Sequence, residues 1–225
     1  MLVTFFSQDW LASLQFRVVV RWPISLVVTD DTLNAYSRIF RFLLQIHYAK
    51  WVLKSLALLK AADSKKPGKR SPTLHTFYTH RAQMYHIVTC VQQYMINRAV
   101  HGVWPKFQEH LDKLEETGDL NHLKEAHYIY LAETCRQLLL GRNSRPARGK
   151  IVRILATSIK IQGISREAML QYRDQANADI AFLLTVLEEI VRQGVQLHLK
   201  DLLMSLNFNK WFTSKHSGTS TASQK

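Results

Sequence analysis

The 225-residue chain has little glycine, proline or cysteine and no long uninterrupted apolar run. Eight glycines and five prolines are few for a turn-rich β-sandwich, and 47% hydrophobic residues supply a sizeable core. This composition favours an all-α fold, expected as a single elongated bundle of about seven or eight helices, two of them long. No apolar run reaches about 18 residues, so no membrane-spanning segment is predicted.

The chain has two cysteines, Cys90 and Cys135, and both fall in helical patterns without metal-ligand spacing. They are expected to be reduced core residues of an intracellular protein. The first 16 residues lack a basic region ahead of their apolar stretch and carry Asp9 within it, which argues against a signal peptide.

Positive charge is in clear excess. Thirty Lys and Arg residues against 17 Asp and Glu residues give a net charge of +13. Such a surface favours an acidic partner, which can be a nucleic acid, an anionic membrane or an acidic protein.

The first long helix has a well-marked beginning. A short amphipathic helix is expected at residues 2–16, followed by an extended connector, because Pro23 disfavours helical geometry at Trp22. Thr29 is the expected N-cap, and Asp30 and Asp31 follow in the first turn, where the helix dipole favours negative charge.

This helix is expected to run to about residue 62 and to be central, because apolar residues form two lines along it at spacings of 3 and 4. Arg38, Arg41 and Gln45 occupy the narrow polar stripe that remains. The two apolar lines are Leu33, Tyr36, Phe40, Leu43 and Ile39, Phe42, Ile46, Ala49, Leu53, Leu56.

The rest of the chain is expected to be helical between two basic loops at residues 62–73 and 141–150. Helix signals are Pro105 in a first turn, Asp119 as an N-cap, and Gly141, Gly163 and Gly194 at C-termini. Residues 1–213 are expected to form one domain, and residues 214–225 a disordered tail. The predicted helices span residues 74–100, 105–117, 120–140, 149–162, 165–193 and 196–206.

No candidate catalytic or metal-binding pattern in the sequence has the residue spacing that such a site requires. His122 and His127 in "HLKEAH" are five residues apart, whereas zinc ligands on one helix face need a spacing of four. The segment at 141–150 lacks the glycine spacing of a phosphate-binding P-loop. We therefore expect no enzyme, no cofactor and no small-molecule substrate, and we interpret His127 as a hydrogen-bonded core histidine.

The basic runs leave a second function class open. Lys65, Lys66, Lys69 and Arg70 form one run, and a second contains Arg142, Arg145, Arg148, Lys150 and Arg153. Neither run interleaves aromatic residues for base stacking, so solubilising loops are favoured over a specific nucleic-acid site. The broad apolar face of residues 38–60 likewise favours a core helix over a basic helix on a membrane surface.

Five segments, in order, carry a resemblance to one family. They are "LQFRVVVRWPISLVVTDDTLNAYSRIFRFLLQIHYAKWVL" (14–53), "HRAQMYHIVTCVQQYM" (80–95), "VWPKFQEHL" (103–111), "DLNHLKEAHYIYL" (119–131) and "HLKDLLMSLNFNKWF" (198–212). Together they resemble the C-terminal domain of the γ-tubulin complex protein family, and the fifth and sixth components in particular. His47 and Tyr48 depart from the pattern, since members usually have basic residues there. The chain begins where that C-terminal domain begins, so the family's N-terminal domain is expected to be missing.

The resemblance implies an all-helical, non-catalytic scaffold that binds γ-tubulin and other complex components and supports microtubule nucleation. It implies a place in the cytoplasm and cytoskeleton, at microtubule-organising centres such as centrosomes and spindle poles. The alternative function is a basic helical module for nucleic acid or an anionic membrane surface.

We expect γ-tubulin contacts at Arg38 and Arg41 and at Phe208, Asn209 and Lys210. Structural roles are expected for Trp22, Pro23, Thr29, Arg81 and Trp104. If the Trp22 ring is buried, its replacement by alanine should cost about 3–5 kcal/mol.

Overall fold

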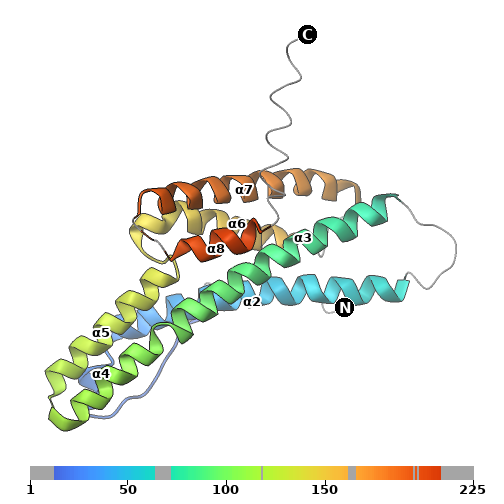
Figure 1. Ribbon diagram of the computed structural model, residues 1–225. Coiled ribbons are helices and arrows are strands. Elements are labelled where there is room, and N and C mark those ends of the chain that lie inside the picture. Colours follow the sequence, from blue (N-terminus) through green and yellow to red (C-terminus); the bar gives the residue numbers. More distant parts are fainter. Residues whose placement is uncertain are drawn as a thin grey trace. The chain divides into compact units, whose positions relative to one another are not determined.

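The computed structural model describes residues 13–63, 72–117, 119–161, 166–194, 196 and 198–208 (Figure 1). Every regular element in these ranges is helical, which confirms the all-α class. None of the helices in these ranges is long and apolar enough to cross a membrane. The helices are α2 (Asp30–Asp63), α3 (Pro72–Met95), α4 (Trp104–Thr117), α5 (Leu120–Gln137), α6 (Arg145–Lys160), α7 (Arg166–Arg192) and α8 (Leu199–Leu206), with short η1 (Ile24–Leu26), η2 (Ile96–His101) and η3 (Arg142–Ser144).

The chain divides into two compact units, and α2 and α3 contribute residues to both. The first unit contains Met1–Gln45 and Gln92–Arg145, and the second contains Ile46–Val91 and Pro146–Lys225. The predicted assignment of residues 1–213 to one domain stays a prediction, as do the helix count and the single elongated bundle.

The beginning of α2 follows the predicted signals. The helix starts at Asp30, directly after Thr29, and carries Asp30 and Asp31 in its first turn. The Thr29 carbonyl accepts the Leu33 N–H at 3.0 Å and the Thr32 hydroxyl at 2.7 Å. Thr29 therefore occupies the N-cap position, whose carbonyl accepts the first backbone hydrogen bond of the helix.

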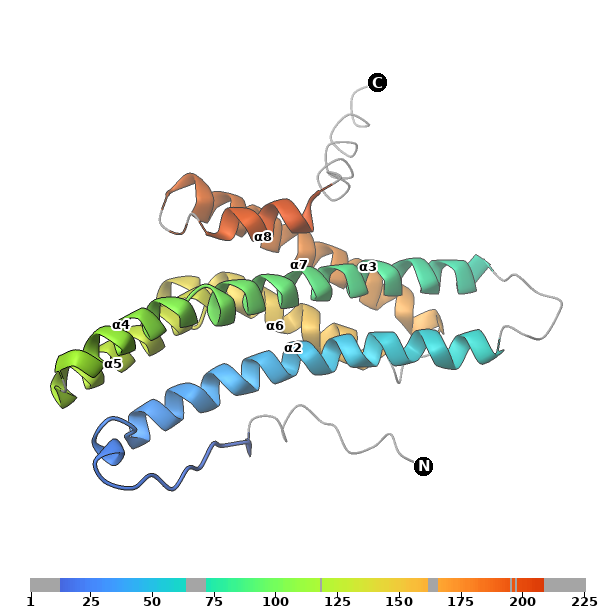
Figure 2. The ribbon, with the colours of Figure 1, turned by 60° about the horizontal axis from the view of Figure 1, so that its bottom comes forward.

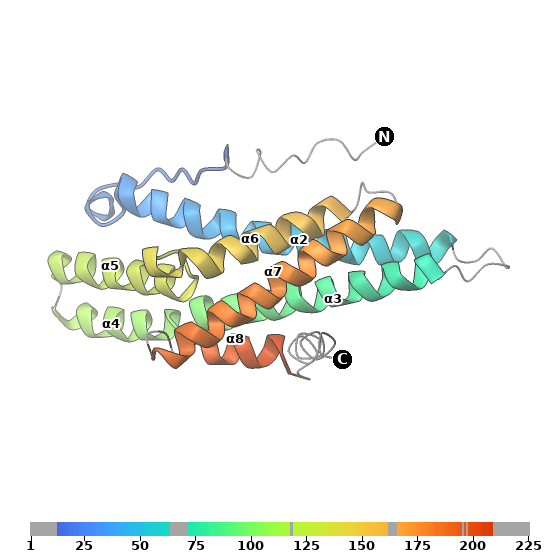
Figure 3. The same ribbon diagram turned by 90° about the horizontal axis from the view of Figure 1, so that it is seen from above.

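The core of the first unit forms around the α4–α5 hairpin and the start of α2. Helices α4 and α5 lie side by side and antiparallel (Figure 3). His127 is buried, and its Nε2 lies 2.9 Å from the Tyr36 hydroxyl, so the predicted hydrogen-bonded core histidine is confirmed. The apolar residues buried in this unit include Phe42, Met95, Ala99, Val103, Leu131, Leu138 and Leu139.

The second unit buries the later part of the predicted α2 line, namely Ile46, Ala49, Leu53 and Leu56. Helices α7 and α8 pack against each other along the chain's last described segment. Arg81, for which a structural role was predicted, donates through Nη1 to the Leu53 carbonyl at 2.9 Å and so joins α3 to α2. Each fully buried leucine, isoleucine or methionine contributes about 1.5–3 kcal/mol. Such residues include Ile46, Leu53, Met84, Ile151, Leu155, Ile180, Leu183, Leu187, Leu199 and Leu202.

Several predicted boundaries are wrong. Residues 14–16 of the expected first helix have no regular structure, and residues 2–12 lie outside the described part. Helix α5 ends at Gln137, where Leu139 takes the left-handed conformation (φ 59°), whereas Gly141 does not. The predicted basic loop at 141–150 is largely helical, because Pro146 sits in the first turn of α6, where its missing N–H costs nothing.

Other predictions hold or lie outside the described residues. Gly194 has φ +71° directly after α7, as a C-terminal glycine should. Cys90 is buried, Cys135 is half-buried, and neither forms a disulfide. Gly163, the basic run at 65–70, and the predicted disordered tail at 214–225 are outside the described residues.

Gly102 marks the break between α3 and α4. The helix following Met95 widens into the π-helical η2, and a Cβ atom at Gly102 would lie 2.7 Å from the Arg98 carbonyl oxygen. A side chain at this position would force the backbone apart, so the turn into α4 requires glycine.

Candidate partner-binding surface

The segment ahead of α2, residues 16–26, presents its large apolar side chains to solvent. Val19 is 99% exposed and Trp22 is 79% exposed. Large apolar side chains that gather on a folded surface usually mark an interaction site. The exposed set is Phe16, Val18, Val19, Trp22, Ile24 and Leu26.

The backbone of this segment is nevertheless held in place. The Phe16 N–H donates to the Ser37 hydroxyl at 2.9 Å, and the Phe16 ring meets the Phe40 ring edge-on at 4.7 Å. Figure 2 shows the chain turning at η1 and running alongside α2. A tethered backbone with outward side chains lowers the ordering cost of binding a partner.

Trp22 and Pro23 lie at the turn of this segment, where their peptide bond is cis. The Leu26 N–H donates to the Pro23 carbonyl at 3.0 Å, which closes the short helix η1. Because the Trp22 ring is exposed, the expected loss of about 3–5 kcal/mol for a buried ring does not apply to it.

Arg38 and Arg41 lie on α2 near the point where the leading segment is bonded to it. Both lie within about one turn of Ser37, the residue that anchors the leading segment. Arg38 is exposed and donates through Nη2 to the Leu140 carbonyl at 3.2 Å, and Arg41 donates through Nε to the Ser37 carbonyl at 3.2 Å. Arg38 thus reaches the end of α5, whereas Arg41 bonds to the backbone of Ser37, to which the Phe16 N–H also donates through the side chain.

A second apolar feature lies on the α4–α5 hairpin. The Phe107 and Tyr130 rings stack at 4.7 Å, and Trp104 packs against both while remaining 43% exposed. Trp104, for which a structural role was predicted, is therefore a half-exposed packing residue. The hairpin also holds an apolar groove between Val103, Phe107 and Ile129, with Lys106 and Glu133 at its edge.

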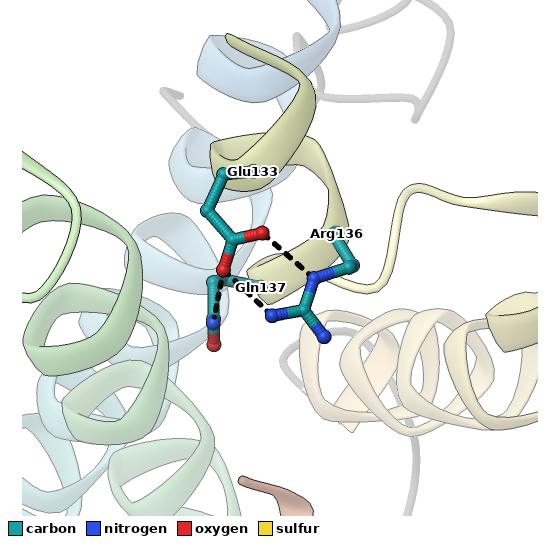
Figure 4. Close-up of polar contacts among 3 residues, drawn as sticks. All are labelled: Glu133, Arg136 and Gln137. Atoms are coloured by element: carbon teal, nitrogen blue, oxygen red, sulfur yellow. Dashed lines mark hydrogen bonds and ion pairs between the residues drawn. The ribbon is translucent and has the colours of Figure 1, made fainter. Parts of the chain in front are cut away.

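Glu133 organises the polar side of this groove (Figure 4). Its carboxylate accepts hydrogen bonds from Arg136 Nε at 2.8 Å, from Arg136 Nη2 at 2.7 Å and from Gln137 Nε2 at 2.7 Å. The hydrogen bond to Glu133 raises the pKa of Arg136 above its ordinary value. The bidentate pair fixes the Arg136 guanidinium beside the last turn of α5.

The predicted C-terminal contact is described only in part. Phe208 is 90% exposed just after α8, so it is not a core anchor. Asn209 and Lys210 lie outside the described residues. Phe208 belongs to the second unit and remains a separate candidate contact.

Two of the predicted basic residues are engaged within the second unit. Lys150 Nζ lies 3.0 Å from Asp179 Oδ1, and Arg153 Nε lies 3.3 Å from Asp179 Oδ2. Lys150 also lies over the Phe182 ring, 4.3 Å from its centroid. Lys150 and Arg153 therefore neutralise the buried Asp179 carboxylate. This basic run then has less positive charge available to bind a nucleic-acid backbone.

A family model described as "Gamma tubulin complex component C-terminal" matches residues 4–212. The chain belongs to this family. The match spans both compact units, from the leading segment through Phe208.

Curated relatives agree with this assignment. Gamma-tubulin complex component 6 of Mus musculus is 29% identical over 92% of this chain and 12% of its own length. Gamma-tubulin complex component 5 of Mus musculus is 26% identical, over 87% of the chain and 22% of its own length. Spindle pole body component 98 of Dictyostelium discoideum is 24% identical over 54% of the chain. The chain thus spans only a small part of the length of the relatives it matches.

Residues 17–22 were expected to form an extended connector and Trp22 to have a structural role, so the exposure of this segment was not predicted. One signal was present: Arg17 and Arg21 interrupt the apolar run, as residues on a surface segment commonly do.

Proposed function

We propose that this chain is a non-catalytic scaffold of the γ-tubulin complex that binds γ-tubulin and supports microtubule nucleation. The match of the family model over residues 4–212 carries the proposal. Other components of the complex are further proposed partners. The relatives' names, which include a spindle pole body component, support a place at centrosomes and spindle poles within the cytoplasm and cytoskeleton.

The contact surface that we assign to γ-tubulin is the leading segment, residues 16–26, together with Arg38 and Arg41. Aromatic residues and arginines dominate the binding energy of most protein interfaces. Trp22 supplies an exposed aromatic side chain, and the two arginines lie on the helix that anchors its segment. Phe208, with Asn209 and Lys210, is kept as a second contact in the other unit.

The charge of the chain suits this partner. A net charge of +13 attracts an acidic protein, and complementary charge raises the association rate more than the final affinity. An apolar centre formed by Trp22 and its neighbours would then set the dissociation rate. Binding should therefore survive moderate salt, whereas binding to nucleic acid through several phosphates weakens by roughly 10³-fold.

The test is capture of purified γ-tubulin by this chain at physiological salt, with α/β-tubulin as the comparison protein. Selective capture of γ-tubulin supports the proposal. Equal capture of both tubulins would show that charge alone acts, and no capture would contradict direct binding by this chain. Moderate salt should leave most of the captured γ-tubulin bound.

Two pairs of matched variants locate the contact. Trp22→Ser should reduce capture at least tenfold, whereas Trp51→Ser, at another exposed tryptophan (54%), should not. The double reversal Arg38→Glu, Arg41→Glu should also reduce capture, and Arg142→Glu, Arg145→Glu is its charge-matched control. If both variants of a pair reduced capture equally, the corresponding half of the assigned surface would not be the contact.

A further inference from the structure

Two neighbouring hollows lie on the α4–α5 hairpin within the first unit, and together they form one groove, which we call the hairpin groove. Their volumes are about 120 and 300 Å³. Both are lined by His110, Ala126 and Ile129, so they share a wall and follow one another along the two helices. Phe107 and Tyr130 complete the first hollow.

The shared wall of the hairpin groove is apolar and partly open to solvent. Ile129 borders both hollows and is 54% exposed. Ala126, only 9% exposed, lies at the base of both and has a short side chain, so a helix laid over it can approach closely. A hollowed apolar surface of this kind on a folded helix pair is typical of a groove that receives another helix.

The aromatic side of the groove is held in place before any partner binds. The Phe107 and Tyr130 rings stack at 4.7 Å, and the Trp104 ring lies 5.7 Å from the first and 5.8 Å from the second. Side chains that are already ordered lose little conformational freedom on binding. The first hollow is therefore preformed.

The two hollows have the spacing of neighbouring side chains on one face of a helix. On α5, the first hollow is lined by residues within 126–133 and the second by residues within 122–129, a shift of one turn. Side chains four residues apart on a helix share a face and lie about 6 Å apart along its axis. A cavity of about 150 Å³ holds a benzene molecule, so each hollow admits one large apolar side chain.

The charges at the edges of the groove define the rest of the partner. Glu133 is already held by Arg136 (Figure 4), and Lys113 is paired within its own helix. Lys106 on the α4 edge and Glu125 on the α5 edge form no ion pair with another described residue. Lys106 lines the first hollow and Glu125 the second, so the two charges lie diagonally across the groove.

We propose that the hairpin groove binds an amphipathic helix of another protein, with two large apolar side chains four residues apart. This helix has an acidic residue on the flank beside Lys106 and a basic residue on the opposite flank beside Glu125. Turning the helix end for end would place like charges together, so the diagonal pair also fixes its direction. The groove shares no residue with the surface assigned to γ-tubulin, and this inference does not depend on that assignment.

A synthetic peptide provides the probe. It has about 18 residues on an alanine background, with two leucines four residues apart and with glutamate and lysine on opposite flanks. Fluorescence anisotropy with the full chain should show saturable binding, and exchanging both leucines for serine should weaken it at least about tenfold. Exchanging glutamate with lysine in the peptide should weaken binding about threefold. No saturable binding, or equal binding of these peptides, would overturn the proposal.

A substitution on the shared wall ties the binding to the groove. Ile129→Asp should weaken binding of the leucine peptide at least about tenfold, because it places a carboxylate between the two hollows. Tyr128→Asp is the control, since Tyr128 is the preceding residue, is 70% exposed and lines neither hollow. Circular dichroism checks that both variants fold. Equal binding by the two variants contradicts the site.

A double charge reversal tests the direction of the bound helix. Lys106→Glu, Glu125→Lys should invert the preference, so that the peptide with exchanged glutamate and lysine binds more tightly. Asp112→Lys, Lys124→Glu is the charge-matched control, at two exposed residues of the same helices that line neither hollow, and should keep the original preference. An original preference retained by the first variant would overturn the proposal.

Other occupants of the groove give different results. If Ile129→Asp converted a dimer of this chain to a monomer in analytical ultracentrifugation, the occupant would be a second copy. If it reduced capture of γ-tubulin as much as Trp22→Ser, the groove would belong to the γ-tubulin contact. Either result would overturn the proposal, whereas loss of peptide binding with unchanged mass and unchanged γ-tubulin capture supports it.

Discussion

The Tyr36 hydroxyl and His127 Nε2 lie 2.9 Å apart and join α2 to α5 across 91 residues of sequence. Burial raises the pKa of Tyr36 to about 12, and nearby Tyr130 adds to this. Burial also lowers the pKa of His127. Both groups are therefore neutral near pH 7, which is the state in which a hydroxyl and an imidazole can share one hydrogen bond.

Replacing Tyr36 by phenylalanine should destabilise the protein by about 1–3 kcal/mol, because His127 Nε2 is left buried without a partner. Urea unfolding measures the change. Tyr128→Phe is the control, since Tyr128 follows His127 on α5 but is exposed, and should change stability by less than about 0.5 kcal/mol. Equal effects of the two substitutions would show that the Tyr36 bond contributes nothing specific.

Trp22→Ala should change the unfolding free energy by less than about 0.5 kcal/mol, since most of the ring is already in contact with solvent. Leu53→Ala, in the core of α2, should cost about 2–5 kcal/mol in the same denaturant experiment. A loss at Trp22 as large as that at Leu53 would mean that the ring is buried in solution, and the assigned contact surface would have to be abandoned.

Lys150→Met should destabilise the protein more than Arg153→Met, although both cations pair with Asp179. The Lys150 side chain is 23% exposed against 55% for Arg153, so water screens its interaction with the buried carboxylate less. Thermal unfolding of the two variants compares them, with exposed Lys200→Met as the control. The reverse order would show that the Lys150–Asp179 contact is not the stronger one.

Stability should fall as the pH decreases from about 6.5 toward 4. Because the folded-state pKa of His80 is lowered to about 4 from 6.5, the unfolded chain binds a proton first in this window. One such histidine contributes a slope of up to about 1.4 kcal/mol per pH unit. His127 shifts in the same direction and adds to the effect.

His80→Gln should remove most of this slope, whereas His86→Gln should retain it. Urea midpoints measured from pH 7 to pH 4 in phosphate-free buffer give the comparison. If His80→Gln left the slope unchanged, the proton would be taken up by another group. His127→Gln would then measure the contribution of His127.

Local residue chemistry accounts for the parts of the fold that were predicted well. Thr29 with the two aspartates after it marked the start of α2, and Asp119 accepts the Asn121 N–H at 2.8 Å as an N-cap should. The 3-and-4 spacing of Ile46, Ala49 and Leu53 placed these residues in the core, where all three are buried. These features depend on neighbours within about one or two helical turns, so sequence spacing is sufficient to find them.

The predictions were wrong where contacts between distant parts of the chain determine the local structure. Gly141 is the more favourable residue for a left-handed backbone, yet Leu139 adopts it while its side chain is fully buried. Apolar burial can offset a local conformational cost of about 1–2 kcal/mol. The basic segment at 141–150 became helix for a related reason, because Ala147 and Ile151 bury one face of α6.

By itself, the sequence determined the helical class, the start of α2, the hydrogen-bonded nature of His127 and the family resemblance. Tertiary structure alone decided that Trp22 faces solvent, that Arg38 bonds to the Leu140 carbonyl, and that Lys150 and Arg153 meet at the buried Asp179. Helix periodicity shows which residues share a face, but not whether another part of the chain covers that face. Exposure and the meeting of distant side chains depend on how helices pack, and packing is a property of the whole fold.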